Sequence, residues 1–372
     1  MSLTVPKYNL RVKNLLELLE LKNLDAIIIT KAENFFYFLG AVSTISTKKN
    51  GPVSTAVFCK DVPEVHIYVT EDEFDRISDE LSSNGISVAV SSCGFESSPT
   101  VEAIKYAKKH CKGNSVGVDD CCYLDYASLG LHYEDLSSKI LEIRMVKDKS
   151  EIDSIITASN FIMDATFDVI RDLYKLKNES EILARFEELL RSRGINNYGT
   201  IGLVSSGNRT KYVHGYTTNR EIVKDLPIIL NIAATYNFYY SDFGRTIIPS
   251  NTESIEPIKK YYDILVHIRG NLLDLLRPGN SVEEIMTNIA EEYRRESLLL
   301  THPIGRGIGL DLVEPPFLVP GYKSVLKEGE VISIHPWFKI ADEKFGLKIV
   351  DTVLITNSFP KLVTEFPTIL YY

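Results

Sequence analysis

The feature that most constrains this chain is the segment Ile228–Ile247, IILNIAATYNFYYSDFGRTI. It begins with isoleucine and leucine and ends with tyrosine and phenylalanine, and the small residues Ala233 and Ala234 stand between these halves. Runs of β-branched and aromatic residues favour strands, so the segment predicts two adjacent strands with a tight bend in the middle. One polar residue stands on each strand, Asn231 on the first and Asp242 on the second.

The composition limits the class of protein. With 372 residues, of which 44% are hydrophobic and 24% charged, the chain is expected to form two globular domains. Its net charge of −9 argues against a nucleic-acid partner, which usually meets a basic face. No apolar run approaches the roughly 20 residues that span a bilayer, and the amphipathic N-terminus lacks a signal-peptide cleavage site. We therefore expect a cytoplasmic protein without nucleic-acid or membrane partners.

The number and spacing of the cysteines are consistent with a cytoplasmic protein. Their number is odd, and none of them forms a CxxC pair. Reduced, buried thiols are therefore expected. The five cysteines are Cys59, Cys93, Cys111, Cys121 and Cys122.

Helix and strand patterns alternate in the first part of the chain, which favours an α/β domain over residues 1–140. Strands are expected at 25–30, 54–58, 65–69 and 86–90, and helices at 8–23, 71–82 and 101–109. Residues 32–40 form a polar turn followed by an aromatic run.

A charged segment, 141–152, marks the expected domain boundary, and residues 141–372 form an α+β domain. Ser150 is expected to cap a helix that runs to about residue 173. Further helices are expected at 179–193, at 258–276 with Pro257 in its first turn, and at 282–297 after a capping box that starts at Ser281.

The histidines divide into two groups. Four of the seven, His66, His110, His132 and His267, lack an acidic or glycine-rich context and are expected to be structural or superficial. The other three are catalytic candidates, because a histidine at a strand end or beside glycine can project from a rigid scaffold. His214 lies in YVHGY, His302 precedes GRGIG, and His335 ends a strand before Pro336. GRGIG itself lacks the context of a dinucleotide-binding loop.

Several segments, in order along the chain, together resemble the pita-bread metallopeptidases, a family that includes Xaa-Pro dipeptidase, aminopeptidase P and creatinase. They are NFFYFLG, RMVKDKSEIDSI, VHG at 213–215, the Asn231 and Asp242 pair, HPIGRGIGLDLVEPP, LKEGEVISIHP and GLKIVDTVLIT. The resemblance covers nearly the whole chain. It implies a creatinase-like α/β N-terminal domain and an α+β pita-bread C-terminal domain.

The resemblance also implies a site in which two divalent metals, such as manganese, cobalt or zinc, are held by two Asp, one His and two Glu. At the positions that match those ligands, the chain has Asn231 for the first Asp and keeps Asp242 for the second. Arg306 stands where the family has its His, in GRGIG. His335 and Val350 stand where it has its two Glu, in IHP and KIVD.

Other positions of the family's cleft are partly kept. Val313 replaces a histidine that helps to bind substrate, and Lys348 replaces an arginine, whereas His214 and His302 are retained. Arginine cannot be deprotonated in a protein, so Arg306 would repel a cation. We therefore expect no metal cofactor, and we expect Arg306 to form an ion pair with Asp242.

The leading hypothesis is a peptidase fold that has lost metal-dependent cleavage and binds a peptide or small molecule in the old cleft. One alternative is a metal-free, creatinase-like hydrolase that uses His214 as general acid and base. Another is an active Xaa-Pro dipeptidase with one ion on Asp242, His335 and His302. A further alternative is an interaction module, like histone-chaperone relatives of this fold.

Less specific interpretations apply to the same residues. Arg306 could be a surface residue, His335 a core histidine, and His302 a cap of the glycine-rich turn. The resemblance also implies a homodimer.

Overall fold

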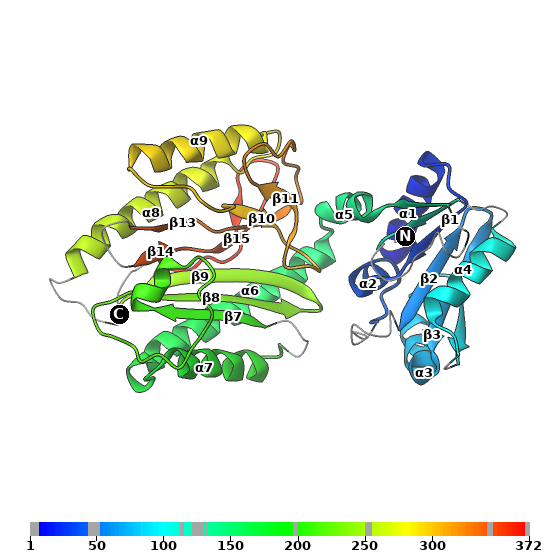
Figure 1. Ribbon diagram of the computed structural model, residues 1–372, viewed down its shortest axis with the longest axis horizontal. Helices are drawn as coiled ribbons and strands as arrows, with labels where there is room; N and C mark the ends of the chain where they lie inside the picture. Colours follow the sequence, from blue (N-terminus) through cyan, green and yellow to red (C-terminus); the bar gives the residue numbers. More distant parts are fainter. Residues whose placement is uncertain are drawn as a thin grey trace, which may run out of the picture. The chain divides into compact units, whose positions relative to one another are not determined.

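The computed structural model describes residues 7–43, 53–82, 84–94, 96–111, 115–120, 130, 132–195, 200–249, 255–340 and 345–368. The chain divides into two compact units, Met1–Ile143 and Arg144–Tyr372 (Figure 1). Among the described helices, none is long and apolar enough to cross a membrane.

The first unit is built on a six-stranded sheet with the order β4-β3-β2-β1-β5-β6. β1 and β2, and β2 and β3, pair antiparallel, and the other pairs are parallel. Its strands are β1 (Ala26–Ile29), β2 (Ser54–Cys59), β3 (Val62–Thr70), β4 (Val88–Cys93), β5 (Ser115–Val118) and β6 (His132–Asp135). Its helices are α1 (Lys7–Leu21), α2 (Ala32–Leu39), the 3-10 turn η1 (Glu71–Glu73), α3 (Phe74–Ser82) and α4 (Pro99–His110). The strands and helices that were predicted here are present.

Helix α2 occupies the segment that was described only as a turn and an aromatic run. Its rings Phe35 and Phe38 are fully buried, and it ends at Gly40, which has a φ of 77°. Aromatic residues favour strands by propensity, so packing decides the structure of this segment.

The expectation of reduced thiols is wrong for two cysteines. Cys59 on β2 and Cys111 at the end of α4 form a disulfide, with their Cα atoms 5.4 Å apart. α4 packs across β2, which brings together residues separated by 52 positions in sequence. Cys93 is free and buried, and Cys121 and Cys122 lie outside the described residues.

The second unit contains a three-stranded sheet, β7-β8-β9, a five-stranded sheet, β11-β10-β12-β15-β16, and the pair β13-β14. Its strands are β7 (Ile201–Ser206), β8 (Ile228–Tyr236), β9 (Tyr239–Ile247), β10 (Gly305–Gly307), β11 (Glu314–Leu318), β12 (Val331–Ile334), β13 (Trp337–Lys339), β14 (Gly346–Lys348), β15 (Asp351–Leu354) and β16 (Lys361–Leu362). Its helices are α6 (Lys149–Asp172), η2 (Leu173–Lys175), α7 (Glu179–Ser192), η3 (Gly207–Lys211), α8 (Glu256–Leu275) and α9 (Val282–Arg295). Helix α5 (Ser137–Met145) includes the division between the units.

Two hydrophobic layers hold these sheets. α6 and α7 cover one side of β7–β9 and share a core with Phe243 and Ile232. α8 and α9 pack on β12 and β14 around Phe338 and Leu347 (Figure 1). The site lies on the strands between these two layers.

The bend between β8 and β9 lies further along than expected. Ala233 and Ala234 are inside β8, and the turn consists of Asn237 and Phe238, with φ of 47° and 70°. A two-residue hairpin turn with positive φ at both positions matches the strand twist, and asparagine tolerates that conformation.

One predicted N-cap, Ser150, is wrong, and a second, Ser281, is confirmed without the capping box that was predicted there. The N-cap of α6 is Asp148, which forms a capping box with Glu151, so the helix starts before Ser150. Ser281 is the N-cap of α9, but its side chain makes no capping hydrogen bond. Pro257 does lie in the first turn of α8, as predicted.

Candidate functional site

The strand registers place the two polar residues of the opening segment together. Asp242 on β9 is opposite Ala233 on β8, and Asn231 is two residues from Ala233, so its side chain lies on the same face. The Nδ2 atom of Asn231 donates to Oδ1 of Asp242 at 2.9 Å.

A second pair of strands reaches the same carboxylate. Arg306 on β10 is directly opposite Ser333 on β12. Arg306 donates from Nη2 to Oδ2 of Asp242 at 3.0 Å, and the Ser333 hydroxyl donates to the same oxygen at 3.0 Å. The predicted ion pair between Arg306 and Asp242 is confirmed. Because its side chain is 15% exposed on a strand, Arg306 is not a residue of a surface loop.

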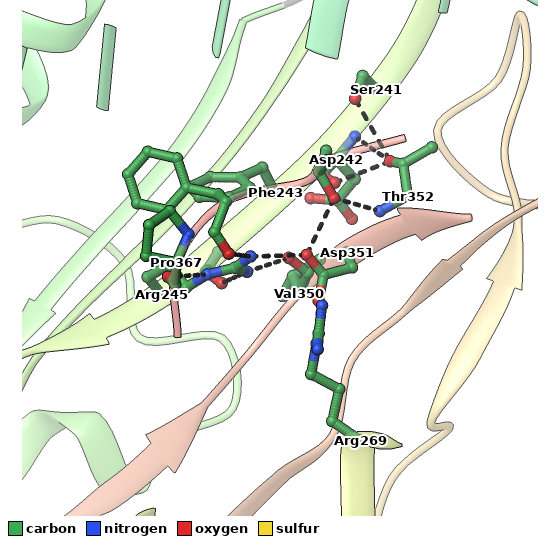
Figure 2. A network of polar contacts seen from close by, with 12 residues as sticks. Ser241, Asp242, Phe243, Arg245, Arg269, Val350, Asp351, Thr352 and Pro367 are labelled. Atoms are coloured by element: carbon green, nitrogen blue, oxygen red, sulfur yellow. Dashed lines mark hydrogen bonds and ion pairs between the residues drawn. The ribbon is translucent and has the colours of Figure 1, made fainter. Parts of the chain in front are cut away.

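The backbone of Asp242 is held by Thr352 on β15. The Thr352 hydroxyl donates to the carbonyl oxygen of Asp242 at 2.8 Å and accepts from its N–H at 3.0 Å (Figure 2). This contact fixes the position of the carboxylate relative to the five-stranded sheet.

Lys348, at the end of β14, adds a second cation. Its Nζ donates to Oδ1 of Asn231 at 2.7 Å and to the carbonyl oxygen of Val213 at 3.3 Å, and the residue is 4% exposed. The contact with Val213 brings the segment with His214 to the site. Burial lowers the pKa of Lys348 to about 8, and the repulsion of Arg306 acts in the same direction against the attraction of Asp242. Below we call Asn231, Asp242, Arg306, Ser333, His335 and Lys348 the Asp242 cluster.

Of the three candidate histidines, His335 belongs to this cluster and the other two lie near it. Nε2 of His335 is 3.6 Å from Oδ2 of Asp242. Nε2 of His302 donates to the carbonyl oxygen of His335 at 3.1 Å, and its ring packs edge-on against Trp337. His214 is exposed in the loop that follows η3.

All three imidazoles are disfavoured as cations. Burial is the largest cause of the lowered pKa of each, and it holds the pKa of His335 well below the usual range. Lys348 lowers the pKa of all three further, and Arg306 lowers the pKa of His214 and His335. The charges near His214 are therefore cations, which would repel a guanidinium substrate.

The two valines at the predicted site positions contribute no polar atoms. Val350 is fully buried, and its backbone pairs with that of Gly244 on β9. A Cβ at Gly244 would lie 2.9 Å from Cγ2 of Val350, so the close approach requires glycine. Val313 is 56% exposed and stands outside the hydrogen-bonded cluster.

A second carboxylate, Asp351, lies next to the cluster, and the sequence did not predict the ion-pair network around it. Asp351 on β15 accepts from Nη2 of Arg245 at 2.8 Å and from Nε of Arg269 at 2.5 Å (Figure 2). Asp351 and Arg245 are fully buried. This network joins β9, β15 and α8.

Ser333 and Thr352 were also missed. Each stands two residues from a position that was singled out, Ser333 from His335 and Thr352 from Val350. Residues two apart on a strand share a face, so this spacing could have identified them.

Among the described residues, no group of three or more His, Cys, Asp and Glu side chains is arranged to hold a metal ion. The Asp242 cluster instead places two cationic side chains, Arg306 and Lys348, around one carboxylate.

Comparisons with known proteins agree on one family. The model of metallopeptidase family M24 matches residues 154–357, and the model of the creatinase/prolidase N-terminal domain matches residues 11–146. The Xaa-Pro dipeptidase of Pyrococcus furiosus is 25% identical over 369 residues, which cover 95% of this chain and 97% of that protein.

Two further relatives extend over both units. An uncharacterized peptidase of Methanocaldococcus jannaschii is 29% identical over 365 residues, 95% of each chain. The crystal structure of the prolidase from Pyrococcus horikoshii superimposes with a TM-score of 0.82 at 23% identity and covers 97% of this chain and 99% of that one.

Proposed function

The chain belongs to metallopeptidase family M24, and from this premise we propose that it binds a peptide or small molecule at the Asp242 cluster without metal-dependent peptidase activity. It is a prolidase-like member, with a creatinase-type α/β N-terminal domain and a pita-bread C-terminal domain, as predicted.

One observation carries the proposal. The guanidinium of Arg306 lies 3.0 Å from Asp242, the single carboxylate among the positions that match the family's ligands. A metal in that position would have to displace a permanent cation from its counter-ion. Hard divalent ions need several oxygen or imidazole ligands, and two such ions need several carboxylates to offset their charge.

The other positions add to this argument. The amide of Asn231 donates to Asp242 and accepts from Lys348. Val350 is an apolar side chain packed on Gly244. His335 is near Asp242, but the protonated Arg306 and Lys348 lie around both. We infer that these residues do not fit two divalent ions.

In a binding role, the same side chains hold a ligand and catalyse no reaction. The cluster is rigid, because Asp242 is held through its side chain by three residues and through its backbone by Thr352. Rigid and partly buried polar groups are suited to orient a bound ligand.

The test is hydrolysis of Xaa-Pro dipeptides by the full chain, with and without added manganese or cobalt. The Xaa-Pro dipeptidase of Pyrococcus furiosus serves as the positive control under the same conditions. We expect no release of proline above the background rate. Cleavage that manganese stimulates and a chelator removes would contradict the proposal.

A further inference from the structure

The Asp242 cluster has an excess of positive charge with unused hydrogen-bond donors, and we propose that it binds a compact oxyanion, a carboxylate or a phosphate, between Arg306 and Lys348. This inference rests on the proposed function, because it names the chemical class of the ligand for the same cluster.

The first support is the balance of charge. Arg306 and Lys348 are the cations of the cluster, and Asp242 is its one carboxylate. The neighbouring carboxylate, Asp351, does not compensate, because two arginines already pair with it. An anion that entered here would meet uncompensated positive charge in a site of low solvent exposure, where such attraction is strong.

The second support is the guanidinium of Arg306. Its Nη2 atom donates to Asp242, whereas its buried Nη1 atom has no hydrogen-bond partner in the described parts of the chain. Buried donors are nearly always paired, so an unpaired one needs an explanation. A guanidinium fork binds carboxylate and phosphate oxygens with good geometry, and the free side of this fork can take one.

The third support is the ammonium of Lys348. The residue is 4% exposed, and both of its acceptors, Asn231 and Val213, are neutral groups. A buried ammonium with neutral acceptors alone is costly, and a counter-ion would relieve that cost. Its two hydrogen bonds leave one of its three N–H groups for a ligand.

The neutral side chain of Asn231 keeps the net charge of the cluster positive. Its amide donates to Asp242 and accepts from Lys348, so it links the two charges without neutralising either. An aspartate in its place would supply Lys348 with a counter-ion of nearly the same shape, while it would lose the donor to Asp242 and place a second carboxylate beside that residue. The substitution Asn231→Asp therefore fills, from within the chain, the electrostatic role that we assign to the ligand.

The experiment is isothermal titration calorimetry of the full chain at pH 7 and constant ionic strength. The probes are inorganic phosphate, glycyl-proline, and glycyl-prolinamide, which lacks the carboxylate. We expect saturable binding of phosphate or of glycyl-proline, and the amide to bind at least tenfold more weakly than glycyl-proline if the latter binds. Binding of phosphate but not of glycyl-proline would indicate a phosphate ligand. Binding of glycyl-proline but not of phosphate would indicate a carboxylate ligand.

Two variants and one control locate the binding. Arg306→Met removes the guanidinium, and Asn231→Asp adds the internal carboxylate, so each should weaken binding at least tenfold. Arg295→Met removes an arginine that is 73% exposed on α9 and should leave the affinity unchanged. Circular dichroism shows whether each variant is folded.

The proposal is overturned if neither anion binds the wild-type chain, if both variants bind as well as wild type, or if the amide binds as tightly as the acid. The manganese-dependent cleavage assay on the same wild-type sample separates the two proposals. Cleavage would overturn the proposed function, whereas absent anion binding without cleavage would overturn only the oxyanion site.

Discussion

Two aspartates on neighbouring strands of this molecule are paired with arginine in different ways. Asp351 is paired with Arg245 and Arg269, and Asp242 with Arg306 (Figure 2 shows the first network and Asp242 beside it). Arg245 uses all its N–H groups, because it also donates to the carbonyl oxygens of four residues. These residues are Gly244, Val350, Phe366 and Pro367.

Arg306 differs in that one of its terminal nitrogens is buried without a partner among the described residues. Asp351 and Arg245 are fully buried, whereas the Arg306 side chain is 15% exposed. A pair that serves only the fold uses every donor and excludes water. An ion pair that keeps unpaired hydrogen-bond donors and some solvent exposure is suited to bind a ligand. The difference therefore separates a structural ion pair from a candidate binding site.

The largest expected effect is on the structural pair. Arg245→Met should lower the free energy of unfolding of the second unit by about 3–5 kcal/mol, because it leaves buried Asp351 with only one arginine and frees several carbonyl groups. Denaturation followed by the fluorescence of Trp337, the single tryptophan of the chain, measures this. A loss below 1 kcal/mol would contradict the structural role that we assign to Arg245.

Lys348 should make the stability of the second unit depend on pH. Its folded pKa is about 8 and its ordinary value is 10.5, so between these values the unfolded chain binds more protons and stability rises with pH. The contribution is roughly 3 kcal/mol over the full window, at about 1.4 kcal/mol per pKa unit.

The measurement compares wild type with Lys348→Met in urea at pH 7.5, 8.5 and 9.5. The difference in free energy of unfolding, wild type minus variant, should increase toward high pH. Lys323→Met removes an exposed lysine and should give a curve parallel to that of wild type. If the Lys348→Met variant also gave a curve parallel to that of wild type, the assignment of the pH dependence to Lys348 would be wrong.

The smallest effect is expected at the candidate binding pair. Arg306→Met should change the free energy of unfolding by no more than about 1 kcal/mol, because Asp242 keeps the donors of Asn231 and Ser333 and the nearby charge of Lys348. The same Trp337 fluorescence transition reports it. A loss as large as that of Arg245→Met would mean that Arg306 serves the fold.

Much of the fold could be predicted from the sequence, because apolar periodicity is local. The strands β8 and β9 and the long helices follow from it, and the family motifs gave the two-unit architecture. The turn at Asn237 and Phe238 was missed because alanine was taken as a break, although it is compatible with a strand interior. The disulfide between Cys59 and Cys111 depends on packing of α4 over β2, which no local pattern encodes.

The site could be predicted in part. Positional matching placed Arg306 near Asp242, and charge alone then predicted their contact. The roles of Ser333 and Thr352 depend on strand register, and the neutral acceptors of Lys348 depend on the path of the loop at Val213. Such details are set by tertiary contacts.

We propose that the Asp242 cluster excludes the divalent metals that the family resemblance implies. Elemental analysis of the full chain, purified without chelator and then incubated with manganese, measures this. We expect a manganese content far below one ion per chain after the excess is removed, and we expect the Pyrococcus furiosus dipeptidase to retain metal under the same treatment. One or more ions retained per chain, and lost in an Asp242→Ala variant, would contradict it.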